Sequence, residues 1–138
     1  MRRLALLVAV LAAVAAGTAQ AAATPEQVVR AWSHALNTND NVAAARLFAL
    51  NARVVQPGVD VRLASRALAI GFNNALPCGG KIVDLRIAGS RVLATFLLGH
   101  RPKHRCDGPG QKAAALFVVR DGKIVLWKQV PVPEQPTA

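Results

Sequence analysis

Residues 113–130 read Ala-Ala-Ala-Leu-Phe-Val-Val-Arg-Asp-Gly-Lys-Ile-Val-Leu-Trp-Lys-Gln-Val, and this stretch decides the fold class. Two runs rich in β-branched and aromatic residues, 113–120 and 123–130, flank Asp121-Gly122, a dipeptide typical of two-residue hairpin turns. The first run is apolar at seven consecutive positions, so both faces of this strand must be covered. The stretch therefore predicts an antiparallel hairpin in a sheet that helices cover on one face.

Upstream of this hairpin, the sequence contains one more strand pair and, before it, helical periodicity. The first helix has a clear start, because Thr24 can cap it, Pro25 suits its first turn and Gln27 can complete a capping box. We expect three helices, a short extended piece and a second strand pair joined by Gly89-Ser90; these elements are predicted at 24–36, 42–48, 63–72, 53–56, 81–88 and 91–100.

The N-terminus has the order of a secretory signal. Arg2-Arg3 precede an apolar run of thirteen residues, 4–16, and small residues follow it up to Ala21. A membrane span needs about 20 apolar residues, so an uncleaved anchor is the less favoured interpretation. We expect residues 1–23 to be removed, leaving a secreted, extracytoplasmic protein without an integral membrane segment. It would consist of one domain, 24–131, and a disordered tail, 132–138.

The exported part is basic. Removing Arg2 and Arg3 lowers Lys+Arg from 17 to 15 against 7 acidic residues, so the net charge falls from +10 to +8. Four of these basic residues, Arg101, Lys103, Arg105 and Lys112, lie with His104 in the loop 101–112, which could contact an anionic surface. The aromatic interleaving of a single-strand binder is absent there, and export argues against nucleic acid as a partner.

The two cysteines, Cys78 and Cys106, both lie in the exported part. An even number of cysteines in an oxidising compartment predicts a disulfide. The bridge would close about 27 intervening residues and stabilise the fold by about 3 kcal/mol. A zinc site with His100 and His104 is the competing interpretation, but the paired-ligand spacing of such sites is missing, so we expect no metal.

Four segments in the right order resemble members of the nuclear transport factor 2-like superfamily, in particular the SnoaL-like and steroid isomerase-like domains. They correspond to the opening helix, the second helix, the first strand and the last hairpin of that family, and they are residues 24–40, 44–48, 52–57 and 121–125. The resemblance implies an α+β fold, in which a cone-like curved antiparallel sheet of four to five strands packs against three N-terminal helices. It also implies a largely apolar pocket inside the cone.

The resemblance further implies where a steroid isomerase would carry its chemistry. The base, a carboxylate just before the proline of the first strand, corresponds here to Gln56, and a neutral amide cannot accept a proton. The oxyanion site pairs a tyrosine with a protonated acid, and those positions resemble Trp32 and Ala115 in a chain without any tyrosine. All three positions depart from the pattern, which argues against isomerase activity.

The predicted pocket therefore has no assigned catalytic residue and no cofactor. The residues expected to line it are Trp32, Gln56, Asp60, Phe72, Phe96, Ala115 and Trp127. The favoured hypothesis is a non-enzymatic module that binds a small hydrophobic ligand or a partner protein in the cone. The alternative is an isomerase, lyase or hydrolase that uses Asp60 with Gln56 or with a strand histidine. A homodimer through the sheet is also compatible with the sequence.

Overall fold

The computed structural model describes residues 13–18 and 20–135. Of the predicted secretory signal, residues 1–12 and 19 lie outside the described residues, and its remaining part forms neither helix nor strand. The predicted tail is described only as far as residue 135, again without helix or strand. In the described part of the chain, no helix is long and apolar enough to cross a membrane.

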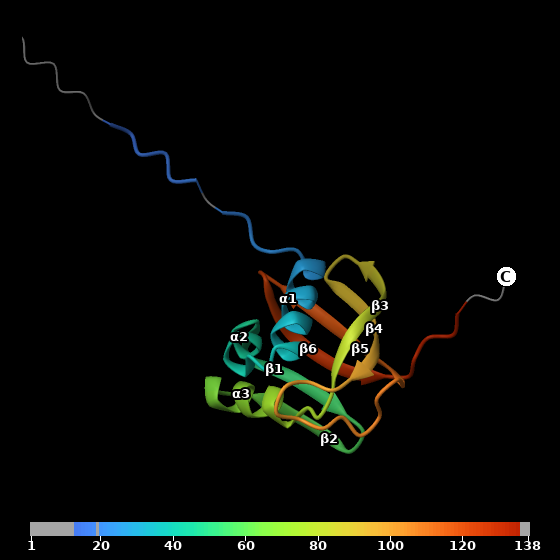
Figure 1. Cartoon of the computed structure of the whole chain (residues 1–138). Helices are drawn as coiled ribbons and strands as arrows, with labels where there is room; N and C mark the ends of the chain where they lie inside the picture. The colour runs from blue at the N-terminus through green and yellow to red at the C-terminus, as the bar shows by residue number, and fades with distance from the viewer. Residues whose placement is uncertain (1–12, 19, 136–138) are drawn as a thin grey trace, which may run out of the picture.

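The domain is α+β, with three helices packed against one curved sheet, as predicted (Figure 1). The sheet has six strands, one more than the upper expectation, in the order β2-β1-β6-β5-β4-β3. All neighbouring strands are antiparallel except β1 and β6, which pair in parallel. The elements are α1 (Pro25–Asn37), α2 (Asn41–Arg46), β1 (Phe48–Gln56), β2 (Val59–Leu63), α3 (Arg66–Ala75), β3 (Gly79–Ala88), β4 (Arg91–Gly99), β5 (Lys112–Arg120) and β6 (Lys123–Val130).

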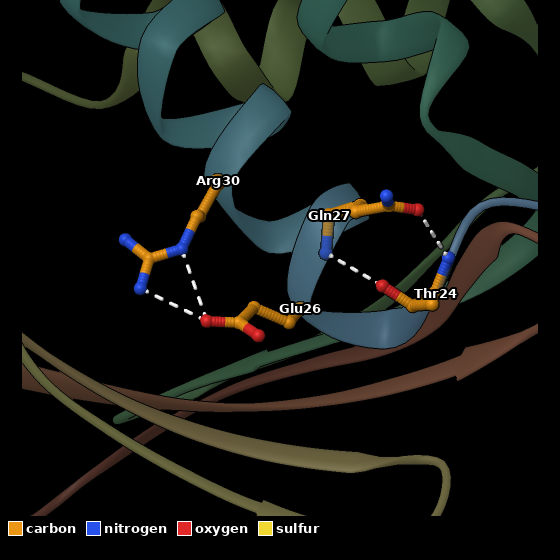
Figure 2. Close-up of polar contacts among 4 residues, drawn as sticks. All are labelled: Thr24, Glu26, Gln27 and Arg30. Carbon is orange, nitrogen blue, oxygen red and sulfur yellow. Dashed lines mark hydrogen bonds and ion pairs between the residues drawn. The ribbon is translucent and has the colours of Figure 1, made fainter.

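The start of α1 is the predicted capping box (Figure 2). Thr24 Oγ1 accepts a hydrogen bond from the Gln27 backbone N–H at 3.2 Å, and Gln27 Oε1 accepts one from the Thr24 backbone N–H at 2.9 Å. One turn later, Arg30 pairs with Glu26 at 2.9 Å on the exposed side of the helix. The two capping hydrogen bonds satisfy backbone donors at the start of the helix and fix where α1 begins.

Two element boundaries differ from the sequence expectation. Helix α2 ends at Arg46, and Phe48 already begins β1, which extends to Gln56 between β2 and β6. Leu63 ends β2 instead of opening a helix, and α3 begins at Arg66 after the cap Ser65. Pairing on both edges of β1 supplies backbone hydrogen bonds that outweigh the local helical pattern, a tertiary override of sequence propensity.

Helix α1 packs into the concave face of the sheet. Its Trp32 contacts three rings of the sheet edge-on or tilted, with ring centroids 6.1 Å from Phe96, 5.3 Å from Phe117 and 6.3 Å from Trp127. The buried residues of the helices and of the concave face of the sheet form one hydrophobic cluster, so the core lies between α1 and the sheet.

The start of β3 approaches α1 so closely that it needs glycine. The Asn37 side-chain amide donates to the Gly80 carbonyl at 2.9 Å and accepts from the Gly80 N–H at 2.8 Å. A Cβ atom on Gly79 would collide with Asn37 Oδ1. This contact holds the end of α1 directly against the edge strand β3.

The convex face of the sheet carries much of the positive charge. Strand register places Phe96, Ala115 and Trp127 on the concave face, so neighbouring positions along each strand point to the opposite face. Exposed cations occupy such outward positions on five strands; they include Arg53, Arg62, Arg86, Arg91 and Lys128. The basic character of the chain is therefore strong on the face that points away from the helices.

Candidate functional site

A cavity of about 280 Å³ lies between α1, the concave face of the sheet and the loop before β5. Its volume is just below the range of about 300–1,000 Å³ that is typical of sites for drug-sized ligands. The cavity therefore suits a molecule smaller than a typical drug. Five of the seven residues predicted to line a pocket do line it, namely Trp32, Gln56, Phe96, Ala115 and Trp127.

Strand register explains why these residues meet. Ala115 on β5 lies opposite Ala94 on β4, so it shares a face with Phe96, two residues further along β4. Trp127 and Gln129 are two residues apart on β6, which places both side chains on the concave side. Gln56 ends β1 beside them, and its Nε2 lies 3.5 Å from Gln129 Oε1.

The indole of Trp32 is fixed by a buried hydrogen bond. Its Nε1–H donates to Asn73 Oδ1 at 2.8 Å, and the Asn73 amide donates in turn to the Ala69 carbonyl at 2.8 Å within α3. Both Trp32 and Asn73 are buried. Because an indole has a single N–H, Trp32 has no donor left for a developing oxyanion in the cavity.

Arg101 closes the end of the cone near α2 and α3. It is only 3% exposed, and its guanidinium donates to the carbonyls of Asn73 and Leu76 and to the side-chain oxygens of Asn39 and Asn41, at 2.5–3.0 Å. Burial lowers the pKa of Arg101 below its usual value. Arg101 is thus not part of an exposed basic loop, contrary to the expectation from the sequence, because its buried side chain holds the loop against the helices.

A disulfide joins Cys78 to Cys106 and confirms the predicted pairing. The bridge fixes the loop after β4 beside the start of β3, and the His100 ring assists it, since His100 Nδ1 accepts from the Cys106 N–H at 3.0 Å. The next residue, Asp107, lines the cavity and is exposed, so its carboxylate lies at the mouth. One of its oxygens is 3.5 Å from Cys78 Sγ.

Two predicted pocket residues lie elsewhere. Asp60 is an exposed residue on β2, and its carboxylate pairs with Arg53 on the neighbouring strand at 2.5–2.8 Å. The Arg53 hydrogen bond and charge hold the pKa of Asp60 below its usual value. Phe72 on α3 is half-buried and packs edge-on against Trp127 and Phe48, with ring centroids 5.2 and 5.8 Å away, so it supports the cavity wall from behind.

Four residues that shape the site were not expected there. Gln129 could have been found, because it follows Trp127 by two positions on the same strand. Asn73 lies one helical turn after Ala69, on the stripe of α3 that is buried. No local pattern identifies Arg101 or Asp107, because long-range contacts of a loop place them.

The cavity brings together the three positions to which the family resemblance assigned the chemistry of a steroid isomerase, and each carries a side chain without acid–base capacity. Gln56, Trp32 and Ala115 all line it. None of the three histidines of the chain does so, and among the described lining residues Asp107 is the only charged one. The walls of the cavity can therefore contact the apolar part of a ligand, and the Gln56 and Gln129 amides can donate or accept hydrogen bonds. The Asp107 carboxylate lies at the solvent-exposed mouth.

A second hollow, of about 560 Å³, is an open groove outside the cone between α1 and the edge of the sheet. Most of its polar side chains are exposed, namely Arg30, His34, Asn37, Lys81 and His100, whereas Ser33 is buried. His34 on α1 is exposed. Because most of its polar side chains are exposed, this groove is a weaker candidate site than the more closed cavity under α1.

Comparison with known proteins gives no match to a protein family by sequence and no curated relative. Solved structures do match. An NTF2-like protein of unknown function from Cytophaga hutchinsonii aligns with a TM-score of 0.65 and 17% identity over 82% of this chain and 92% of its own. The chain has the nuclear transport factor 2-like fold.

Two further structures show the same nuclear transport factor 2-like fold. A proposed polyketide cyclase from Sinorhizobium meliloti aligns with a TM-score of 0.61 and 19% identity over 75% of this chain and 93% of its own. A protein with a ketosteroid isomerase-like fold from Catenulispora acidiphila was solved in complex with trimethylamine. It aligns with a TM-score of 0.60 and 22% identity over 78% of this chain and 86% of its own. At these identities, the likeness concerns the fold and leaves the activity to be argued from the site.

Proposed function

We propose that this chain is an exported protein that binds a small, mainly apolar molecule in the cavity under α1 and catalyses no reaction there. The observation that carries the proposal is the lining of the cavity. Apolar side chains dominate it, and the positions for a base and an oxyanion donor hold Gln56, Trp32 and Ala115. Among the described residues, the only lining carboxylate, Asp107, is at the mouth.

The physical chemistry of the lining supports binding. Apolar surface that leaves water on binding contributes about 25 cal/mol per Å². The Gln56 and Gln129 amides offer both donors and acceptors beside it, which is enough to orient one polar group of a ligand. A small molecule with a compact hydrocarbon part and one polar group is therefore the expected ligand.

Three further observations support parts of the proposal. The ketosteroid isomerase-like neighbour was solved with trimethylamine, a molecule of only a few atoms, so small ligands occur with this fold. The disulfide between Cys78 and Cys106 supports export, because such bridges persist in oxidising compartments. The signal-like N-terminus supports the same conclusion.

A blocked cavity tests binding. Ala115→Leu adds a branched side chain to the cavity wall, whereas the control Ala88→Leu adds the same group at the exposed end of β3. Calorimetric titration with cyclohexanol should show saturable binding to the wild type and to the control, and greatly reduced binding to Ala115→Leu. The proposal fails if the wild type does not bind or if the blocked variant binds equally well, provided that circular dichroism shows all three proteins folded.

A turnover assay tests the absence of catalysis. Cyclohex-3-enone, a small unsaturated ketone, isomerises to its conjugated form by proton transfer next to the carbonyl, and the product absorbs in the ultraviolet. We expect the protein to leave the background rate unchanged. Acceleration that disappears in Asp107→Asn would favour the competing isomerase, lyase or hydrolase function, with Asp107 as the base.

A further inference from the structure

We propose that the ligand of the cavity is an organic cation: a small hydrocarbon body with one protonated amine, which lies at the mouth beside Asp107. This inference rests on the proposed binding function and specifies the class of ligand. It follows from where the charges of the protein lie relative to the cavity and from which side chains form its walls.

The first observation is the sign of the charge at the mouth. Asp107 is the only charged residue among the described residues that line the cavity. The adjacent disulfide fixes its backbone, since Cys106 is bonded to Cys78 and the Asp107 carboxylate lies 3.5 Å from Cys78 Sγ. A carboxylate held at the entrance of an apolar cavity attracts an ammonium group and repels a ligand carboxylate.

The second observation is the aromatic wall. Trp32, Phe96 and Trp127 line the cavity, and the two indole rings are 6.3 Å apart between centroids. The faces of aromatic rings attract cations, and tryptophan does so most strongly. The same rings offer apolar surface to the hydrocarbon part of an alkylammonium ion, whose charge then lies toward the mouth.

Positive charge surrounds the cavity without lining it, since the loop 101–112, which carries Asp107, also carries the exposed Lys103, Arg105 and Lys112. Exposed arginine and lysine residues are numerous on the convex face of the sheet, with Arg53, Arg86 and Lys128 among them, and none of these lines the cavity. Arg101 lies behind the wall and donates to the Leu76 carbonyl, so its charge opposes a cation at the closed end of the cavity. This arrangement favours the ammonium group at the mouth and the hydrocarbon part inside.

Three probes with the same six-membered ring separate the alternatives: cyclohexylamine, cyclohexanol and cyclohexanecarboxylate, titrated into the full mature protein at pH 7 and low salt. We expect the amine to bind about five times more tightly than the alcohol, and the carboxylate to bind most weakly. Raising the salt concentration should reduce the advantage of the amine, because the mouth is exposed.

Two acid-to-amide variants locate the effect. Asp107→Asn should lower the affinity for the amine about fivefold and should affect the alcohol much less, so that the preference for the amine is lost. The control Asp121→Asn removes an exposed acid from the β5–β6 turn, outside the cavity, and should change neither.

The outcomes also separate this inference from the binding function. If the alcohol binds as tightly as the amine, or if Asp107→Asn behaves like Asp121→Asn, the cation inference is overturned while the binding function stands. If none of the three probes binds to the folded wild type, both are overturned.

Discussion

The two tryptophans of the chain line the same cavity, but their indole N–H groups have different surroundings. Trp32 donates to Asn73 Oδ1 at 2.8 Å, inside a hydrogen-bonded set that includes α3 and the Arg101 guanidinium. The Trp127 N–H is buried too, yet no described residue accepts a hydrogen bond from it. One end of the cone is thus closed by a nearly satisfied polar network, and the other is an open, mainly apolar hollow.

The difference shows how this fold can be kept stable while its interior stays accessible. The closed end, around Trp32, Asn73 and Arg101, joins three segments that are distant in sequence. The open end, around Trp127, Gln129 and Asp107, is held in shape mainly by strand pairing and the disulfide. Changes at the closed end should therefore act mainly on stability, and those at the open end mainly on binding.

The largest effect is expected for Arg101→Met. The substitution leaves the carbonyls of Asn73 and Leu76 and two asparagine side chains without their donor in a buried site, which should lower the free energy of unfolding by about 3–5 kcal/mol. Urea unfolding measures the loss. The control Arg105→Met, in the same loop but exposed, should change stability by less than about 0.5 kcal/mol. Equal stability of the two variants would contradict the role given to the closed end.

The disulfide should have the next largest effect. Replacing both Cys78 and Cys106 by serine removes the constraint on the unfolded chain and should cost about 3 kcal/mol. Denaturant unfolding under non-reducing conditions measures the change. Because the bridge also positions Asp107, the double variant should bind cyclohexylamine more weakly even under conditions where it remains folded. Unchanged binding would show that the bridge does not shape the mouth.

A matched pair of substitutions compares the two indoles directly. Trp32→Phe and Trp127→Phe remove the same atoms from the same hydrophobic cluster, but only the first leaves the Asn73 acceptor unpaired. Trp32→Phe should therefore lower the free energy of unfolding by about 1–2 kcal/mol more than Trp127→Phe. Chemical unfolding of the two variants side by side gives the difference. An equal or reversed order would refute the contrast.

The smallest effect is expected at Asp60, outside the cavity. The pKa of this carboxyl is lower in the folded than in the unfolded protein because of Arg53, so the pair stabilises the fold above the unfolded pKa of Asp60. That contribution is lost as the pH falls through the folded pKa. Asp60→Asn should lower the melting temperature slightly at pH 7 and not at all at the acidic end, and it should leave ligand binding intact. If Asp60→Asn instead abolished ligand binding, Asp60 would belong to the binding site after all.

The sequence was a good guide wherever local chemistry determines the structure. The strand pairs of β3–β4 and β5–β6, the capping box of Thr24 and Gln27, and the disulfide were all predicted and confirmed. The strand pairs and the capping box depend on residues that are close in the sequence, namely a turn dipeptide and a capping pattern. The disulfide could be predicted because two cysteines allow only one intramolecular pairing.

Long-range contacts explain what the sequence did not reveal. Phe48 looks like the last apolar residue of a helix, but pairing with Ile124 makes it the first residue of β1. Arg101 looks like a surface cation, and only the folded chain brings it to the carbonyls of α3. In the same way, Asp107 reaches the cavity mouth because the disulfide draws its loop there.

The central claim, that the hollow under α1 is a binding site, is tested most directly by nuclear magnetic resonance. A ¹H–¹⁵N spectrum of the labelled protein contains one indole signal for each of Trp32 and Trp127, which the two phenylalanine variants assign. During titration with cyclohexylamine, both signals should shift and saturate together in the wild type, and neither should shift in Ala115→Leu. Indole signals that stay in place while backbone amides of the outer surface shift would contradict a ligand in the cavity.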